Sequence, residues 1–274
     1  MIRDRALRGE VAEAARVLAR LGLVTAFGHV SARAGDSMLI TPAADLAGVT
    51  AASVIEVPLA VRALPAGAPA EAWAHLALYR ARPDAAAIAR AQPAAAFAVA
   101  AVTTAMVPVH GQAAWLGESV PVYDDAALLR SADRAERAAS CLPAGEALLL
   151  RGNGALTLGA APGLAVARMW LLAAACDVYL AALAASGASP VTTLSDGEIA
   201  SWRAVGGELL PRLWEHLRSG PGWAGPGSAR PGPGEEQGQG QPGDHRRPPA
   251  PRVMPLDLRE EREAHGGAPD REQT

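Results

Sequence analysis

Hydrophobic and polar positions alternate along the first two thirds of the chain with the periods of helices and of short strands. Residues 3–21 place arginine and glutamate between apolar positions, which predicts an amphipathic first helix. A second helical segment ends at the Arg-Pro-Asp turn at 82–84, because proline cannot continue a helix and restricts the residue before it. The apolar run at 85–89 then predicts a buried strand that ends at residues 90–92. This alternation, up to about residue 187, predicts one α/β layer structure.

Two helices are predicted in the following part of the chain. The apolar stretch at 170–185 is interrupted by Asp177, so we expect a core helix and not a membrane span. A final helix is predicted to begin at Ser195, because Ser195 and Glu198 have the spacing of a capping box. Pro211 predicts a kink inside this helix.

The composition changes from residue 219 onward to glycine, proline, glutamine, arginine and glutamate. Such a segment buries too little apolar surface to offset the entropy lost on ordering. We therefore expect one domain over residues 1–218 and a disordered tail over residues 219–274.

Composition and charge narrow the classes of function. A chain of 274 residues that is 50% hydrophobic can bury one substantial core, or at most two small ones. Its net charge of −3 gives no electrostatic reason to expect a nucleic-acid partner. The charged first helix does not resemble a secretory leader, and Cys141 and Cys176 lack metal-like spacing. We expect reduced thiols in a cytoplasmic protein that does not associate with membranes.

The chain contains no lysine. A Schiff-base aldolase needs a lysine amine as its nucleophile, so that mechanism is excluded. Nucleotide chemistry of the P-loop type is excluded for the same reason, because its motif requires a lysine.

The most informative segment is EAWAHLALYRARPDAAAIARAQ at 71–92, where Glu71 and His75 have i, i+4 spacing and share one helix face. Its order of a Glu–His helix, an Arg-Pro-Asp turn, a strand and a residue pair at the strand end resembles the class II aldolase/adducin family. The segment GLVTAFGHVSAR at 22–33 is similar to the family's glycine-containing substrate loop. Further segments fit the family's later elements: 39–42, 120–124, 147–159 and 162–185.

The resemblance covers roughly residues 5–217 and implies the fold. It implies a single three-layer α/β/α domain with a central mixed, mostly antiparallel sheet. It also implies a homo-oligomer, with the tetramer as the common form among family members.

The resemblance includes the positions of a metal site but not its ligands. In the metal-dependent aldolases of this family, the strand ends in His-x-His and a third histidine follows, and all three bind zinc. The matching positions here are Arg90, Gln92 and Asn153. A guanidinium repels a divalent cation, and carboxamides are poor zinc ligands. We therefore expect no metal ion and no other cofactor.

Two residues are candidates for catalysis. The resemblance implies that Glu71 acts as the general acid/base, whereas a solvated carboxylate in the first turn of a helix is the simpler alternative. His75 lies one turn further on and has an ordinary pKa near neutrality, so it is a candidate acid/base group or hydrogen-bond partner. A packed helix histidine is the alternative.

The expected ligand of the site is a small anionic molecule. Arg90 would bind a carboxylate or an enolate through bidentate donors, with Gln92 and Asn153 as neutral donors around it. An Arg90–Glu71 ion pair that fills the vacated metal pocket is the alternative. Three residues of the glycine loop complete the candidate binding set: Thr25, His29 and Ser31.

Three classes of function follow. The first is a lyase that cleaves a carbon–carbon bond of a small anionic hydroxy or keto substrate, by retro-aldol cleavage or decarboxylation, without a metal. The second is a catalytically silent relative that serves as a binding or assembly subunit, as the adducin branch does. The third is a metal lyase with rearranged ligands. A sugar phosphate is disfavoured, because Pro69-Ala70-Glu71 stands where the sugar-phosphate aldolases have a Ser-Ser-Glu segment that helps bind phosphate.

Overall fold

The computed structural model describes residues 2–220, so the predicted tail lies outside the described residues beyond Gly220. The helices are α1 (Ile2–Arg20), α2 (Ala72–Ala81), α3 (Ala94–Val102), α4 (Ala132–Ser140), α5 (Pro162–Ser186) and α6 (Asp196–Ser219). The strands are β1 (His29–Ala34), β2 (Ser37–Ile40), β3 (Ile55–Pro58), β4 (Ala87–Ala91), β5 (Ala105–Met106), β6 (Val120–Tyr123), β7 (Ala147–Leu150) and β8 (Gly154–Gly159). Short 3-10 helices are η1 (Leu46–Gly48), η2 (Ala51–Ser53) and η3 (Gly111–Leu116).

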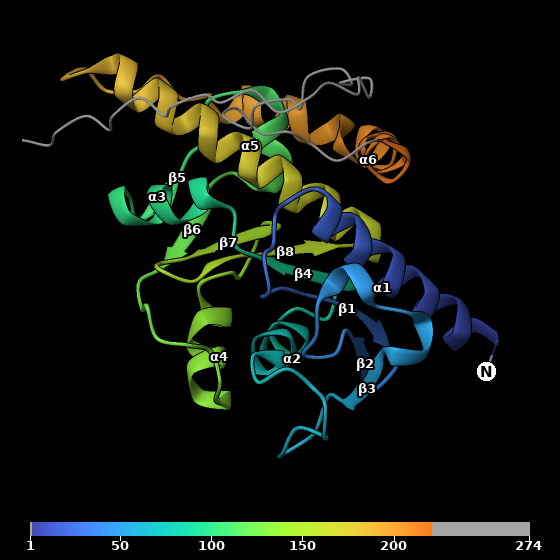
Figure 1. The fold of residues 1–274 in the computed structure, drawn as a ribbon. Helices are drawn as coiled ribbons and strands as arrows, with labels where there is room; N and C mark the ends of the chain where they lie inside the picture. The colour runs from blue at the N-terminus through green and yellow to red at the C-terminus, as the bar shows by residue number, and fades with distance from the viewer. Residues whose placement is uncertain (1, 221–274) are drawn as a thin grey trace, which may run out of the picture. The chain divides into compact units, whose positions relative to one another are not determined.

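The strands form one eight-stranded sheet in the order β3-β2-β1-β4-β8-β7-β6-β5 (Figure 1). Neighbouring strands run antiparallel except β6 and β7, which are parallel. The predicted mixed, mostly antiparallel sheet is therefore confirmed.

Helices cover both faces of this sheet, which confirms the three-layer α/β/α architecture (Figure 1). One hydrophobic core lies between the sheet and α1, α3, α5 and α6. The other lies between the sheet and α2 and α4. Side chains of β4 alternate between these cores, with Ala87, Ala89 and Ala91 facing the first and Ile88 facing the second. Arg90 lies two residues after Ile88 and so faces the α2 side.

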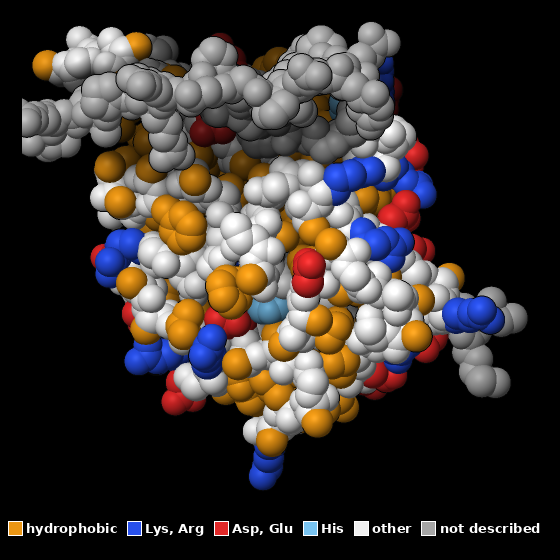
Figure 2. Space-filling model, in the orientation of Figure 1, with side chains coloured by type: hydrophobic (Ala, Val, Ile, Leu, Met, Phe, Trp, Pro, Cys, Tyr) orange, Lys and Arg blue, Asp and Glu red, His pale blue; other side chains and the backbone are white. Residues whose placement is uncertain are grey.

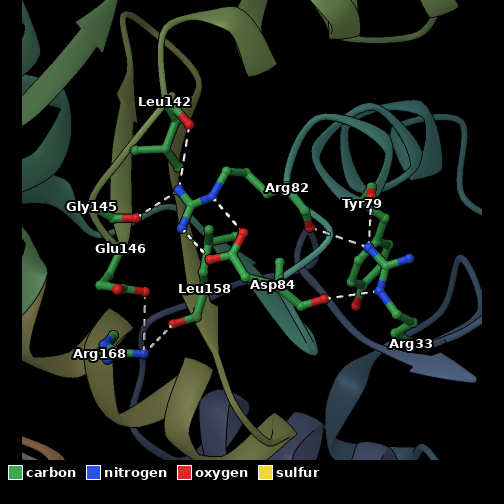
Figure 3. Close-up of polar contacts among 10 residues, drawn as sticks. Arg33, Tyr79, Arg82, Asp84, Leu142, Gly145, Glu146, Leu158 and Arg168 are labelled. Carbon is green, nitrogen blue, oxygen red and sulfur yellow. Dashed lines mark hydrogen bonds and ion pairs between the residues drawn. The ribbon is translucent and has the colours of Figure 1, made fainter.

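Arginine side chains fix α2 to its surroundings (Figure 3). Arg82 follows the last turn, pairs with Asp84 at 2.7 Å and donates to the carbonyl of Gly145 at 2.9 Å. Arg33 on β1 donates to the carbonyls of Tyr79 and Ala85 and lies over the Tyr79 ring. Arg33 thus connects α2 to β1, and Arg82 connects the end of α2 to the segment before β7. These contacts fix the position of α2 over the sheet.

The structure differs from the predicted boundaries at two places. β4 begins two residues later than predicted, because the Ala85 N–H donates to the Arg82 carbonyl and residue 85 belongs to the turn. The final helix has the predicted capping box at Ser195, and it continues through Pro211 to Ser219. Helix α5 is long and apolar enough to span a membrane by length and composition, and most residues of its first half are buried in the core.

Candidate functional site

The strand register brings candidate residues from distant parts of the sequence together under α2. His29 of β1 lies directly opposite Arg90 of β4. Asn153 lies in the turn between β7 and β8, beside the end of β4. Helix α2 covers this face, and Glu71 is its N-cap residue. We call this group the Arg90 cluster: His29, Ser31, Glu71, His75, Tyr79, Arg90 and Asn153.

Arg90 is a buried cation whose hydrogen-bonding capacity is partly unused. Its side chain is 1% exposed, and its Nη2 donates to Asn153 Oδ1 at 2.6 Å. The same Nη2 lies 4.0 Å from Glu71 Oε1, a distance at the outer limit of an ion pair. Nε and Nη1 of Arg90 are buried and have no hydrogen-bond partner among the described residues. Burial lowers the pKa of Arg90 and Glu71 raises it, and an arginine side chain stays protonated in proteins.

Glu71 lies between two guanidinium groups. Its Oε1 is 3.6 Å from Arg130 Nε, in addition to its approach to Arg90. The Glu71 side chain is 13% exposed, so it forms the more accessible edge of the cluster. Two cations share one carboxylate here, which leaves one formal positive charge.

Both histidines of the cluster are held in the neutral form. Burial lowers the pKa of His29 to about 3, and the Arg90 charge acts in the same direction. Burial also puts the pKa of His75 well below its usual value, with His29 and Arg90 adding to the effect. The two rings meet edge to face with their centroids 6.0 Å apart. At neutral pH each imidazole is therefore one donor and one acceptor.

Hydrogen-bond accounting assigns the tautomer of His75. Ser31 Oγ lies 2.7 Å from His75 Nδ1 and 2.9 Å from the Tyr79 hydroxyl. Burial raises the pKa of Tyr79, so the hydroxyl keeps its proton. If Tyr79 donates to Ser31 and Ser31 donates to His75 Nδ1, both hydroxyl hydrogens have an acceptor and only the His75 Nε2 hydrogen is left without one. The reverse direction leaves two buried groups unpaired, the Tyr79 hydrogen and the His75 Nε2 lone pair, and each unpaired group costs about 1–3 kcal/mol.

It follows that His75 carries its hydrogen on Nε2. That atom is buried and has no hydrogen-bond partner among the described residues. His75 is thus a neutral donor whose ring orientation is fixed by Ser31 and Tyr79.

The two remaining predicted site residues, Gln92 and Thr25, are not members of the Arg90 cluster. Gln92 follows β4, is half-buried, and its backbone N–H donates to the Leu23 carbonyl at 3.1 Å. The β7–β8 turn packs against the end of β4 at Gly154. A Cβ on residue 154 would lie 2.2 Å from the Ala91 carbonyl oxygen, so only glycine allows this approach. Thr25 is exposed in the loop after α1.

Three details of the cluster are not in the sequence prediction. The Ser31 hydroxyl is engaged by His75 and Tyr79, so it supports a donor instead of facing a ligand. Tyr79 lies four residues after His75 on one helix face, a spacing that the sequence does show. Arg130 approaches Glu71 from the loop before α4, and no local sequence signal predicts that contact.

The side chains that are present do not fit a zinc ion. Within residues 2–220, no group of three or more histidine, cysteine, aspartate or glutamate side chains is placed to hold a metal. His29, His75 and Glu71 surround a guanidinium, which is the wrong charge beside a divalent cation.

A cavity of about 760 Å³ lies away from the cluster, between α1, the end of β1 and the start of α5. Its charged lining consists of three carboxylates, Asp4, Glu10 and Glu56, and one guanidinium, Arg33. These carboxylates do not suit an anionic ligand, so the Arg90 cluster remains the candidate site.

Comparison with known proteins supplies independent findings. The family model for the class II aldolase and adducin N-terminal domain matches residues 9–180. The crystal structure of L-fuculose-1-phosphate aldolase from Thermus thermophilus superposes with a TM-score of 0.61 at 27% identity, covering 69% of this chain and 100% of that one. No curated protein matches the chain significantly.

Two further solved structures share the fold. One is L-fuculose 1-phosphate aldolase from Glaciozyma antarctica, with a TM-score of 0.65 and 20% identity over 78% of this chain and 89% of that one. The other is an aldolase II superfamily protein from Pseudomonas syringae, with a TM-score of 0.65 and 21% identity over 79% of this chain and 92% of that one.

Proposed function

Because this chain belongs to the class II aldolase and adducin family, we propose that it cleaves a carbon–carbon bond of a small anionic hydroxy or keto acid at the Arg90 cluster. The observation that carries this proposal is the buried Arg90 guanidinium with two unpaired donor atoms. Five side-chain atoms of the cluster are buried without a hydrogen-bond partner among the described residues: His29 Nδ1, His75 Nε2, Arg90 Nε, Arg90 Nη1 and Asn153 Nδ2. Unpaired buried polar atoms are costly in a folded protein, and a bound anion would satisfy several of them.

The residues fit a retro-aldol cleavage that needs no metal. Glu71 accepts the proton of the substrate hydroxyl, and that oxygen becomes the carbonyl of the aldehyde product. The electrons of the breaking carbon–carbon bond form an enolate on the other fragment, and the proton held by Glu71 then passes to the enolate carbon, which releases the second product and restores the carboxylate. Arg90 binds the enolate oxygen or the adjacent carboxylate, and the neutral His75 donates from Nε2. Asn153 turns its oxygen to Arg90, which leaves its Nδ2 as a further donor.

The test compares Arg90→Gln with Arg62→Gln, a matched change at an exposed arginine. Small hydroxy and keto acids are added to each protein while ligand-dependent thermal shifts and release of an aldehyde or carbon dioxide are measured. We expect wild type and Arg62→Gln to respond and to turn over equally with and without a chelator. Arg90→Gln should lose both responses. Stoichiometric zinc in the purified protein, or turnover abolished by the chelator, would overturn the metal-independent mechanism.

A catalytically silent binding or assembly subunit is the second candidate. The observation that favours it is the 4.0 Å approach of Arg90 to Glu71, which partly neutralises the buried cation without any ligand. In that case Arg90→Gln would gain stability, and the wild type would show no turnover of any acid in the screen.

We also infer a cytoplasmic homo-oligomer, with the tetramer as the expected form. Large apolar side chains are exposed on several helices, including Val102 of α3, Val178 and Leu183 of α5 and Trp202 of α6. Figure 2 shows hydrophobic side chains grouped at the surface over α3. Apolar groups of this kind are common at subunit interfaces. Light scattering coupled to size-exclusion chromatography would measure the mass, and a strictly monomeric protein would contradict the inference.

A further inference from the structure

A separate, polar cavity lies on the other face of the sheet, where η3, α5 and α6 meet. Its volume is about 190 Å³, and it is lined by Trp115, Glu146, Arg168, Arg203, Gly206 and Gly207. A water molecule occupies roughly 30 Å³ of liquid volume, so the cavity has room for about six waters. We propose that it binds a phosphate-sized oxyanion, independently of the function proposed for the Arg90 cluster.

The charges that line this cavity are unbalanced. Arg168 and Arg203 supply two positive charges, and Glu146 is the one carboxylate in the lining. Arg168 Nη1 lies 3.5 Å from Glu146 Oε2 and donates to the Leu158 carbonyl at 2.9 Å (Figure 3). Arg203 Nη1 donates to the Ala114 carbonyl at 3.1 Å. One formal positive charge is therefore left over, held by two guanidiniums whose positions are fixed.

Arg168 also retains an unused donor. Its Nε is buried and has no hydrogen-bond partner among residues 2–220. Burial lowers the pKa of Arg168, and the nearby Arg203 charge lowers it too, while Glu146 raises it. A small anion between the two arginines would replace this repulsion by attraction and accept charge-assisted hydrogen bonds. A phosphate suits two guanidiniums better than a monovalent carboxylate does, because it offers more oxygens and more charge.

Two glycines of α6 give the cavity its space. A Cβ on Gly206 would lie 2.9 Å from Trp115 Cδ1, so the helix approaches the indole closely. A Cβ on Gly207 would meet nothing within 4 Å, which places open space beside that residue. Helix α6 lies beyond the family match at residues 9–180, whereas Glu146 and Arg168 lie within it. An anion held here would thus link α6 to the family domain.

The test is calorimetric titration of the full chain with inorganic phosphate, supported by thermal shifts at constant ionic strength. Arg203→Gln removes one guanidinium, and Gly207→Leu places a larger side chain at the cavity lining, where a Cβ would meet no atom within 4 Å. Arg212→Gln is the matched control, because it makes the same change on an exposed face of α6 outside the cavity lining. Acetate tests the monovalent carboxylates, and glycerol phosphate tests a phosphate ester against free phosphate.

We expect saturable phosphate binding by wild type and Arg212→Gln, and binding at least about tenfold weaker for Arg203→Gln, as loss of one charge-assisted hydrogen bond predicts. Gly207→Leu should keep its fold and lose binding. Glycerol phosphate binding as tightly as phosphate would show that the site accepts phosphate esters as well as the free ion, while much weaker binding would assign it to the free ion. Equal binding by Arg203→Gln and wild type, a response to acetate as strong as that to phosphate, or no saturable binding by wild type would overturn the proposal.

Discussion

The buried histidines of the Arg90 cluster make the stability of the protein depend on pH. His29 has a pKa of about 3 in the folded protein, and an exposed histidine has a pKa of 6.5. Between these values the unfolded chain binds a proton that the folded protein does not bind, so stability falls as the pH falls. Working this linkage from pH 7 to pH 5 gives a loss of about 2 kcal/mol from His29 alone. His75 contributes a loss of the same sign, because its pKa is also lowered.

The measurement is urea unfolding at pH 7 and pH 5, followed by tryptophan fluorescence and by circular dichroism. The double variant His29→Gln/His75→Asn removes both groups while keeping polar atoms near the ring nitrogens. Its loss of unfolding free energy between the two pH values should be smaller than that of wild type by at least about 2 kcal/mol. His216→Gln is the control, because His216 is exposed on α6 and its removal should leave the wild-type pH dependence intact.

Equal losses in wild type and the double variant would refute this reasoning. That result would mean that the folded protein protonates both rings freely, and hence that the cluster is open to water. The neutral His75 assigned from the hydrogen bonds would then be wrong as well.

Three further predictions concern the stability of the fold that holds these sites. Gly154→Ala should destabilise the fold by at least about 1–3 kcal/mol in urea unfolding, because φ is +88° and the new Cβ would lie 2.2 Å from the Ala91 carbonyl oxygen. Gly9→Ala in α1 should raise stability by about 0.5–1 kcal/mol, since nothing lies within 4 Å of its Cβ position, and a lowered melting temperature would contradict this. Ser195→Ala removes the capping contact with Glu198 and should cost about 0.5–2 kcal/mol by thermal unfolding, with no loss expected if α6 does not depend on its cap.

The features that sequence reasoning predicts well are those with a local cause. The turn at 82–84 ends α2 because proline cannot continue a helix, and the Ser195 capping box starts α6 where the spacing places it. The mixed, mostly antiparallel character of the sheet was expected from the resemblance to a family, and the order of its strands was not predicted, since strand pairing between distant segments has no local signal. The start of β4 was predicted two residues early, because the hydrogen bond that extends the turn joins two ordinary backbone groups.

The same holds for the candidate site: the sequence predicts which residues belong to it, and the tertiary structure decides which atoms meet. The sequence brought Arg90, Asn153 and Glu71 together through the aligned motif, but it did not determine which atoms face one another. Asn153 was expected to donate to a ligand, and in the structure its oxygen accepts from Arg90 while its nitrogen is left over. Such an orientation depends on the β7–β8 turn and on the guanidinium opposite it. Arg130 reaches Glu71 from a loop, and only the tertiary structure reveals that pair.

The charge balance of the cluster explains why a buried arginine is informative here. Burying an ion costs several kcal/mol, and a single partner repays that cost only when its geometry is good. Glu71 lies 4.0 Å from Arg90 and is shared with Arg130, so its compensation is incomplete. The neutral histidines add donors but no negative charge. An apolar side chain at position 90 would avoid the desolvation cost altogether, so the guanidinium is a stabilising choice only when an anion completes the cluster.

Two cations around one carboxylate, with a buried donor unpaired, recur at Arg168 and Arg203. The same physical argument therefore predicts that small anions stabilise this protein at two separate places, and that each effect is removed by replacing its own arginine.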